Sequence, residues 1–219
     1  AFSQSSKRAL VYHPDLPLLM SPELAWWVGA LWADGYVPPS KKSIMFANAD
    51  QDLLGVMQDT ASDLFGIDCK RYQNKKTGVW SLIWGSSLLS RWLSEVVGFE
   101  KLRVPRAIWS SDAESRGAFL AGVVDGDGSC SPSNIEKPNN LVVSVSVGPQ
   151  HETAVSLAYL VASLGRKPRM RTLQQNWAAR NYDYTYQVVY QKERKALAVP
   201  LLADGEVIRD AESGRFAKG

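Results

Sequence analysis

An internal repeat constrains the fold of this chain more than any other feature of its sequence. Two apolar stretches, Glu23–Gly35 (ELAWWVGALWADG) and Arg116–Gly128 (RGAFLAGVVDGDG), have the character of helices and both end in Asp-Gly. Small residues recur at every fourth position in both: Ala25, Gly29 and Ala33, then Ala118, Gly122 and Gly126. At 3.6 residues per turn each set forms one stripe. Because glycine is unfavourable inside a helix, the stripes predict two helices whose backbones pack closely.

The segments that follow the two stretches also repeat in the same order. Strands are predicted at 36–37, 43–48, 68–73 and 79–85 and helices at 50–65 and 87–97, then strands at 129–133, 140–147, 167–173 and 183–190 and helices at 150–164 and 193–202. The fold class is therefore α+β, with two pseudo-symmetric αββαββα repeats, each with a four-stranded antiparallel sheet. Predicted boundaries are 1–100 for the N-terminal half, 101–112 for a linker broken by Pro105, and 113–219 for the C-terminal half.

Alternation along the strands predicts sheets with one apolar and one polar face. In Leu141–Val147, the side chains of Val143, Val145 and Val147 share a face opposite Ser144 and Ser146. A polar, basic sheet face has the dimensions to lie in the major groove of DNA.

Composition excludes several classes of protein. Hydrophobic residues make up 45% of the 219 residues, which is too many for a disordered chain. No apolar run is long enough to span a bilayer, and the first residues do not resemble a signal peptide. Two cysteines, Cys69 and Cys130, are too few for a disulfide framework. An intracellular location is expected, in the cytoplasm or nucleoid, with an organelle left open.

The net charge is only +3, which by itself argues against a nucleic-acid partner, but the charge is unevenly distributed. Bases outnumber acids by four to one between Gly66 and Trp80, and by eight to two between Arg166 and Lys195. Both stretches also carry aromatic residues. Two interpretations remain open: solvated strand faces, or a surface that binds a polyanion.

Asp34 and Asp127 end the two repeated helices, where the partial negative charge of the helix dipole disfavours a carboxylate. Close helix packing would bring the two acids together, and such a pair needs a cation. Mg²⁺ suits one or two carboxylates, with water and phosphate completing its shell. The simplest alternative is that each Asp-Gly is only a turn. An EF-hand is disfavoured, because Asp125–Ser129 lacks the later Glu at the required spacing.

Leu120–Gly128 (LAGVVDGDG) closely resembles the signature of the LAGLIDADG homing endonucleases, and Trp27–Gly35 (WVGALWADG) is similar to a divergent first copy. The resemblance implies a single-chain, pseudo-dimeric monomer whose two signature helices form the interface between the halves. It also implies that the two sheets form a saddle over double-stranded DNA. Such enzymes cut a long, asymmetric target with divalent metal and leave 3′ overhangs.

The resemblance also implies roles for individual residues. Asp34, Asp127 and the carbonyls of Ala33 and Gly126 correspond to ligands of Mg²⁺, for which Mn²⁺ or Ca²⁺ can substitute in binding. Asn48 corresponds to a polar residue at the end of the second strand, for which the second half offers Gly148 or Gln150. Lys192 corresponds to a basic residue that closes the fourth strand and could stabilise phosphate charge or order water. The catalytic candidates implied by the resemblance are thus Asp34, Asp127, Asn48 and Lys192. Asp125 has Trp32 as its counterpart, which favours a structural role for Asp125.

Recognition of DNA is expected to come from polar, basic and aromatic residues of the strands and hairpins. The candidates are Lys41, Lys42, Lys70, Tyr72, Asn74, Lys75, Lys76 and Trp80 in the first half and Asn140, Ser144, Arg169, Arg171, Gln174, Gln175, Arg180 and Gln187 in the second. Trp26, Trp27, Trp84 and Trp92 are instead expected in the core.

The leading hypothesis is a site-specific, Mg²⁺-dependent double-strand DNA endonuclease without a membrane partner. The rival hypothesis is a non-cleaving binder on the same fold, such as an intron RNA maturase or a transcription regulator. Two retained carboxylates favour the nuclease. The residues expected of a self-splicing intein, a nucleophile at position 1 and a final His-Asn, are not found, which leaves an endonuclease domain taken from an intein or intron.

Overall fold

The computed structural model describes residues 14–38, 40, 42–132, 141–174 and 184–191. The first half contains α1 (Pro22–Asp34), β1 (Gly35–Tyr36), β2 (Ile44–Asn48), α2 (Gln51–Phe65), β3 (Lys70–Gln73), β4 (Trp80–Trp84) and α3 (Ser87–Trp92), which continues as the π-helix η1 (Leu93–Val97). The short helix α4 (Arg106–Trp109) follows. The second half contains α5 (Ala113–Asp127), β5 (Gly128–Pro132), β6 (Leu141–Ser146), α6 (His151–Ser163), β7 (Arg169–Gln174) and β8 (Tyr184–Gln191).

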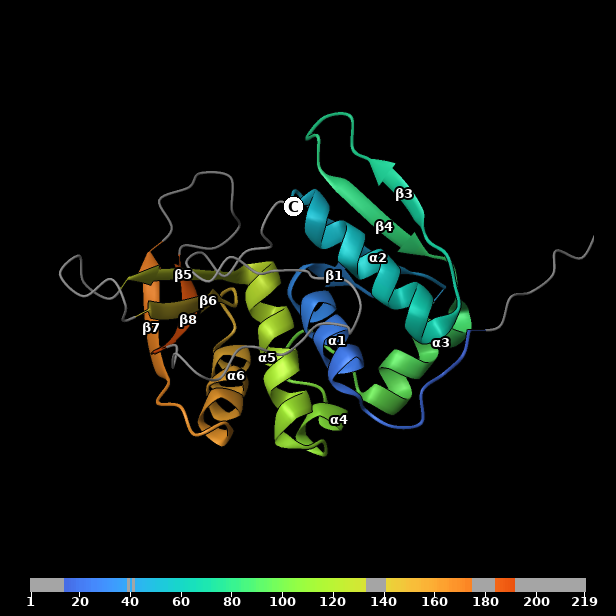
Figure 1. Ribbon diagram of the computed structural model, residues 1–219. Coiled ribbons are helices and arrows are strands. Elements are labelled where there is room, and N and C mark those ends of the chain that lie inside the picture. The colour runs from blue at the N-terminus through green and yellow to red at the C-terminus, as the bar shows by residue number, and fades with distance from the viewer. Residues whose placement is uncertain (1–13, 39, 41, 133–140, 175–183, 192–219) are drawn as a thin grey trace, which may run out of the picture.

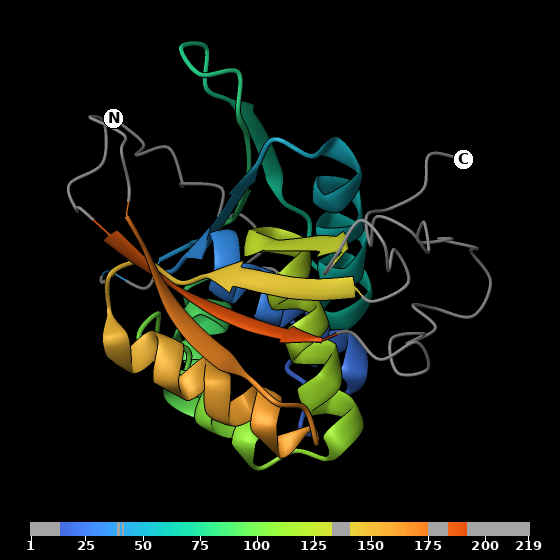
Figure 2. The ribbon, with the colours of Figure 1, turned by 90° about the vertical axis from the view of Figure 1, so that its left-hand side faces the viewer.

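The two sheets have the same topology, which confirms the predicted repeat. Both are four-stranded and antiparallel, with the orders β1-β2-β4-β3 and β5-β6-β8-β7. Helices α1 and α5 lie side by side between the sheets, α2 packs on the first sheet and α6 on the second (Figure 1). Figure 2 shows the second sheet lying across α5 and α6. The α+β fold class is confirmed.

Close contact between α1 and α5 depends on the small-residue stripes. A Cβ atom added to Gly29 would lie 2.1 Å from the carbonyl oxygen of Phe119, and one added to Gly122 would lie 2.1 Å from that of Trp26. Neither backbone atom can move without shifting a helix, so these glycines are required by the helix crossing. The predicted reason for glycine inside both helices is confirmed.

The local sequence explains where the helices begin and end. Ser21 caps α1 by accepting a hydrogen bond from the Leu24 amide, and Pro22 occupies the first turn. Asp50 caps α2, and Gly66 ends it with a φ of 61°, a conformation that favours glycine. Asp112 caps α5 through the Ser115 amide.

The core holds most of the tryptophans expected there. Trp26, Trp27 and Trp84 are fully buried, and Trp92 is partly buried against the same core. The linker differs from the prediction, because residues 106–109 form α4 and Ile108 is buried. The helix predicted at 193–202 lies outside the described residues. Among the described helices none is long and apolar enough to cross a membrane.

Candidate metal centre and nucleic-acid interface

Asp34 and Asp127 are the last residues of α1 and α5, so both carboxylates lie where the two packed helices end. A Cβ atom added to Gly126 would lie 2.5 Å from the Cβ of Ala33 and 3.2 Å from Oδ2 of Asp34. The Asp34 carboxylate therefore reaches across the interface to the last turn of the other helix. A larger residue than glycine at position 126 would push the two helix ends apart.

Asn48 holds the Asp34 carboxylate in place. Its Nδ2 donates a 2.7 Å hydrogen bond to Asp34 Oδ2, and its Oδ1 accepts from the Asp50 amide, which fixes the side chain at the start of α2. Burial raises the pKa of Asp34, while the hydrogen bond from Asn48 and the charge of Lys101 act in the opposite direction. The partly buried carboxylate thus lies in a site that favours a neighbouring cation.

Lys101 supplies a cation at this site. Its ammonium donates to the carbonyl oxygens of Trp32 at 2.5 Å and Ala33 at 2.6 Å, with that of Leu31 at 3.5 Å. These carbonyls belong to the last turn of α1 and lie at its negative pole, where that of Leu31 also accepts a hydrogen bond from the Gly35 amide. Loss of water lowers the pKa of Lys101 to about 8, whereas Asp127 and Asp34 both act to raise it. Both carboxylates are therefore close enough to interact with one ammonium group.

This donor set suits a hard divalent ion. Within the described residues no three side chains of His, Cys, Asp or Glu gather into a metal site. An ion would therefore depend on two carboxylates and main-chain carbonyls, with water and phosphate as the remaining ligands. The binding of the Lys101 ammonium at the end of α1 supports the view that this location attracts positive charge.

The two motif helices use the same position for different purposes. Asp125 accepts a 2.7 Å hydrogen bond from the indole Nε1 of Trp26, which ties the last turn of α5 to the N-terminal half of α1. Its counterpart Trp32 donates through Nε1 to the carbonyl oxygen of Arg103 at 3.0 Å. The structural role expected for Asp125 agrees with this contact.

The counterpart of Asn48 in the second half is apolar. Gly35 pairs with Phe46 in the first sheet and Gly128 pairs with Val145 in the second, so the residue equivalent to Asn48 is Val147. Neither Gly148 nor Gln150, the two residues considered from sequence, occupies this register position. Lys192, predicted as a basic group of the site, lies outside the described residues.

In the first sheet, register divides the predicted DNA contacts between two faces. Leu82 is buried beneath the helices and pairs with Arg71, so Lys70 and Tyr72 lie on the opposite, outer face. Lys75 and Lys76 are exposed in the β3–β4 hairpin, and Lys42 is exposed in the β1–β2 loop. Asn74 lies in the same hairpin, where its Oδ1 accepts from the Lys76 amide.

In the second sheet an ordered row of side chains crosses the outer face. Arg171 Nε donates to Gln187 Oε1 at 3.0 Å, and Gln187 Nε2 donates to Ser146 Oγ at 2.9 Å. Arg169 lies on the same face, because Arg169 and Arg171 pair with Val189 and Gln187. This row presents a basic and amide surface that is already oriented by hydrogen bonds.

Three predicted DNA contacts are placed poorly for that role. Trp80 lies on the helix-side face with Leu82, and the Arg71 guanidinium stands 5.5 Å from the centre of its ring. Gln174 also lies on the helix side. It shares a face of β7 with Met170 and Thr172, and this face pairs with the helix-side residues Val188 and Tyr186 of β8. Ser144 lies on the outer face but is 8% exposed, and its hydroxyl is hydrogen-bonded to that of Ser129 at 2.9 Å. Four further candidates lie outside the described residues: Lys41, Asn140, Gln175 and Arg180.

Sequence reasoning missed Lys101. Two acidic helix ends require a counter-charge, and the segment that joins the halves offers three bases, Lys101, Arg103 and Arg106. Nothing in the sequence distinguishes among them, because only the path of the chain places Lys101 at the end of α1.

Two family models match the chain, and together they cover most of it. Residues 21–96 match the LAGLIDADG-like domain, and residues 103–200 match the Homing endonuclease family. The chain is also 29% identical over 143 residues to a subunit of the A-type ATP synthase of Methanopyrus kandleri. That match covers 65% of this chain but only 13% of the relative, so the chain spans a small part of that protein.

Solved structures share the fold. The homing endonuclease I-DmoI in complex with DNA and Ca is 12% identical with a TM-score of 0.50, over 80% of this chain and 85% of that chain. Mesophilic variants of I-DmoI are 13% identical with a TM-score of 0.51, over 80% and 90%. Full-length DUF199/WhiA from Thermatoga maritima is 14% identical with a TM-score of 0.50, over 81% and 54%.

The family matches, the repeated fold and the two acidic helix ends agree with one another. The chain belongs to the LAGLIDADG homing endonuclease family, as a member that carries two motifs in one chain.

Proposed function

We propose that this protein is a site-specific endonuclease that hydrolyses both strands of a long, asymmetric DNA target with Mg²⁺ and leaves 3′ overhangs. The observation that carries this proposal is the meeting of two carboxylates and a lysine at the packed ends of α1 and α5. A protein that only binds DNA has no need to place a partly buried carboxylate at a helix end, where both loss of water and the helix dipole oppose it.

Asp34, Asp127 and the carbonyl of Gly126 are the proposed ligands of the divalent ion, together with the Ala33 carbonyl that Lys101 also contacts. When bound, the ion would supply Lewis-acid polarisation of the scissile phosphate and activation of water. Asn48 fixes the orientation of the Asp34 carboxylate through the 2.7 Å hydrogen bond. The ammonium of Lys101 is placed to stabilise negative charge that develops on the phosphate.

The outer faces of the two sheets are the proposed DNA-binding surface. Arg171 and Gln187 are suited to base edges in the major groove, since arginine pairs with guanine and glutamine with adenine. Lys70, Lys75 and Lys76 are suited to phosphates, which fix the register of the duplex without reading its sequence. As a pseudo-dimer the chain is proposed to act as a monomer.

A randomised duplex library incubated with the protein tests this proposal. With Mg²⁺ we expect cuts to accumulate at one long sequence, and with EDTA we expect none. Mn²⁺ in place of Mg²⁺ should support cutting, and Ca²⁺ should support binding. Tight binding to one sequence without cutting in any metal would contradict the nuclease.

That last result would favour the second candidate, a non-cleaving nucleic-acid binder such as an intron RNA maturase or a transcription regulator. The observation that favours it is the equal fold similarity to WhiA, which is not described as an endonuclease. The asymmetry of the candidate site, with Val147 where the first half has Asn48, is also compatible with lost cleavage in one half.

The relative in Methanopyrus kandleri supports a module carried within a longer protein, because the match spans 13% of that protein. An endonuclease domain taken from an intein or intron remains the proposed origin. An intracellular location, in the cytoplasm or nucleoid, remains an expectation.

A further inference from the structure

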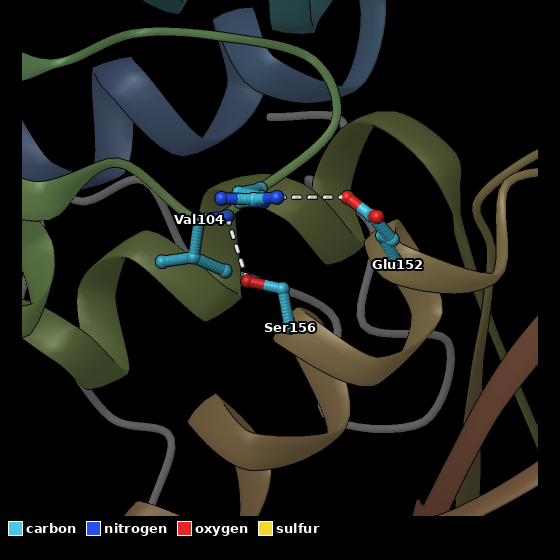
Figure 3. A network of polar contacts seen from close by, with 4 residues as sticks. Val104, Glu152 and Ser156 are labelled. Atoms are coloured by element: carbon cyan, nitrogen blue, oxygen red, sulfur yellow. Dashed lines mark hydrogen bonds and ion pairs between the residues drawn. The ribbon is translucent and has the colours of Figure 1, made fainter.

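The residues Lys101–Val104, here called the linker strap, connect the two halves and contact both of them. At its first residue, Lys101 donates to the carbonyls of α1. At its end, the Val104 amide donates to Ser156 Oγ of α6 at 2.9 Å, and Val104 is buried. Arg103 forms a 3.0 Å ion pair with Glu152, one turn earlier on α6 (Figure 3).

The strap is also held from the first half. The indole Nε1 of Trp32 donates to the carbonyl oxygen of Arg103 at 3.0 Å, and Trp32 is 4% exposed. The same residue accepts a hydrogen bond from the Lys101 ammonium through its own carbonyl oxygen. Trp32 therefore binds both the lysine and the backbone that carries it.

We infer that Trp32 and Ser156 are positioning residues for Lys101. Trp32 fixes the backbone at Arg103 and Ser156 fixes it at Val104, and these two contacts place the Lys101 ammonium at the acidic helix ends. A lysine ammonium has a flexible four-carbon stem, so its location depends on an anchored backbone. Consecutive Cα atoms are about 3.8 Å apart, so anchors at residues 103 and 104 leave Lys101 little range.

The ion pair between Arg103 and Glu152 contributes less than these two contacts. Its side chains are 63% and 64% exposed, and such pairs are weak and screened by salt. The contacts of Val104 and Trp32 lie against buried residues, where a lost hydrogen bond leaves a polar group unsatisfied.

Through the strap, side chains of the second half fix the backbone that carries Lys101, whose ammonium lies at the end of α1 in the first half. Ser156 and Glu152 lie on α6, which packs on the second sheet, while Lys101 caps the helix of the first half. This inference rests on the proposed nuclease function for its catalytic consequence but not for the placement of Lys101. One experiment tests the placement of Lys101, and a second tests its consequence for cleavage.

The first experiment measures the placement of Lys101 without DNA. A small water-soluble acylating reagent is applied to the protein, and the labelling rates of Lys101 and the exposed Lys70 are compared by peptide mass spectrometry. In Ser156→Ala and in Trp32→Phe we expect the ratio of Lys101 to Lys70 labelling to differ about three- to tenfold from that of the unaltered protein, the range allowed by one lost hydrogen bond, because movement of the ammonium changes both its hydrogen bonding and its access to water. Ser156→Thr, which keeps the hydroxyl, and Ser163→Ala, the same change further along α6, should leave the ratio unchanged. An unchanged ratio in both test variants overturns the inference.

The second experiment measures single-turnover cleavage and DNA affinity on a duplex selected from the library by the unaltered protein. We expect Ser156→Ala to slow cleavage about three- to tenfold with less than a twofold change in the dissociation constant, and Ser156→Thr to restore the rate. Equal losses of rate and affinity, or of thermal stability alone, indicate a purely structural contact and contradict the inference. If the unaltered protein cuts no DNA, the proposed function is contradicted. The labelling ratio still tests whether Ser156 and Trp32 position Lys101.

Discussion

The two halves share a topology, a sheet register and an acidic helix end, but they differ in the polar groups around that acid. In the first half Asn48 binds Asp34, whereas Val147 occupies the equivalent register position in the second. At the sixth position of the motif, Trp32 holds the linker, whereas Asp125 accepts from Trp26. The two halves therefore share the helix packing and the sheet topology, while the groups at these two positions differ.

This difference indicates that the two halves contribute different groups to the candidate site. The carboxylates come from both halves, whereas Asn48, which binds Asp34, belongs to the first half, and Lys101 binds the carbonyls that end α1. Variants at matched positions of the two halves test whether this asymmetry matters, and they follow in order of expected effect.

Removal of either carboxylate should have the largest effect. We expect Asp127→Asn to lower double-strand cleavage by a factor of about 1,000 or more while DNA affinity is retained, because the proposed metal loses a charged ligand. Cleavage and affinity are measured on the selected duplex. The neighbouring change Asp125→Asn is the control, since Asp125 contacts Trp26. Undiminished cutting by Asp127→Asn would contradict the metal assignment.

Loss of the lysine should have the next largest effect. We expect Lys101→Met to slow single-turnover cleavage about 100-fold, by analogy with the loss of one preorganised donor. Lys75→Met removes the same charge from the exposed hairpin and should weaken binding without slowing the bound enzyme. Equal rates for the two variants would show that Lys101 contributes only charge.

The strand-end position compares the halves most directly. We expect Asn48→Ala to slow cleavage about tenfold, because the Asp34 carboxylate loses its 2.7 Å partner. Val147→Ala truncates the equivalent residue and should change the rate less than twofold. Separate end-labelling of the two DNA strands measures each cut, and equal losses in both variants would contradict a functional difference between the halves.

Sheet faces provide a test of DNA recognition. We expect Arg171→Ala, on the outer face of β7, to weaken affinity for the selected duplex about tenfold. Gln174→Ala, on the helix side of the same strand, should change affinity less than twofold. Titration at fixed salt concentration measures both, and a larger effect of Gln174 would reverse the assignment of faces.

The smallest expected effect is on stability without metal. Because the pKa of Asp34 is raised in the folded protein, the folded state binds this proton more tightly than the unfolded state does. The contribution of Asp34 to stability is therefore greatest at low pH and declines as pH rises above 3.8 through the raised pKa. Asp34→Asn should remove this dependence and stabilise the protein near neutral pH. Denaturant unfolding across that pH range measures it, with Asp59→Asn on α2 as the control.

Much of the fold could be predicted because its signals are local or repeated. The glycines of α1 and α5, the cap at Asp50 and the turn at Gly66 each act over a few residues, and the second copy supports the first. The linker helix at 106–109 was missed, because four residues carry too little periodicity to distinguish a helix from a turn.

The sequence by itself determined the repeat, the close approach of two helices and the acids that end them, because these follow from residue spacing along one chain. Only the tertiary structure decided which bases and amides join those acids. Asn48 and Lys101 reach Asp34 and the end of α1 through strand register and the path of the linker. Trp80 and Gln174 turn toward the helices for the same reason, since strand pairing decides which face of a sheet each side chain occupies.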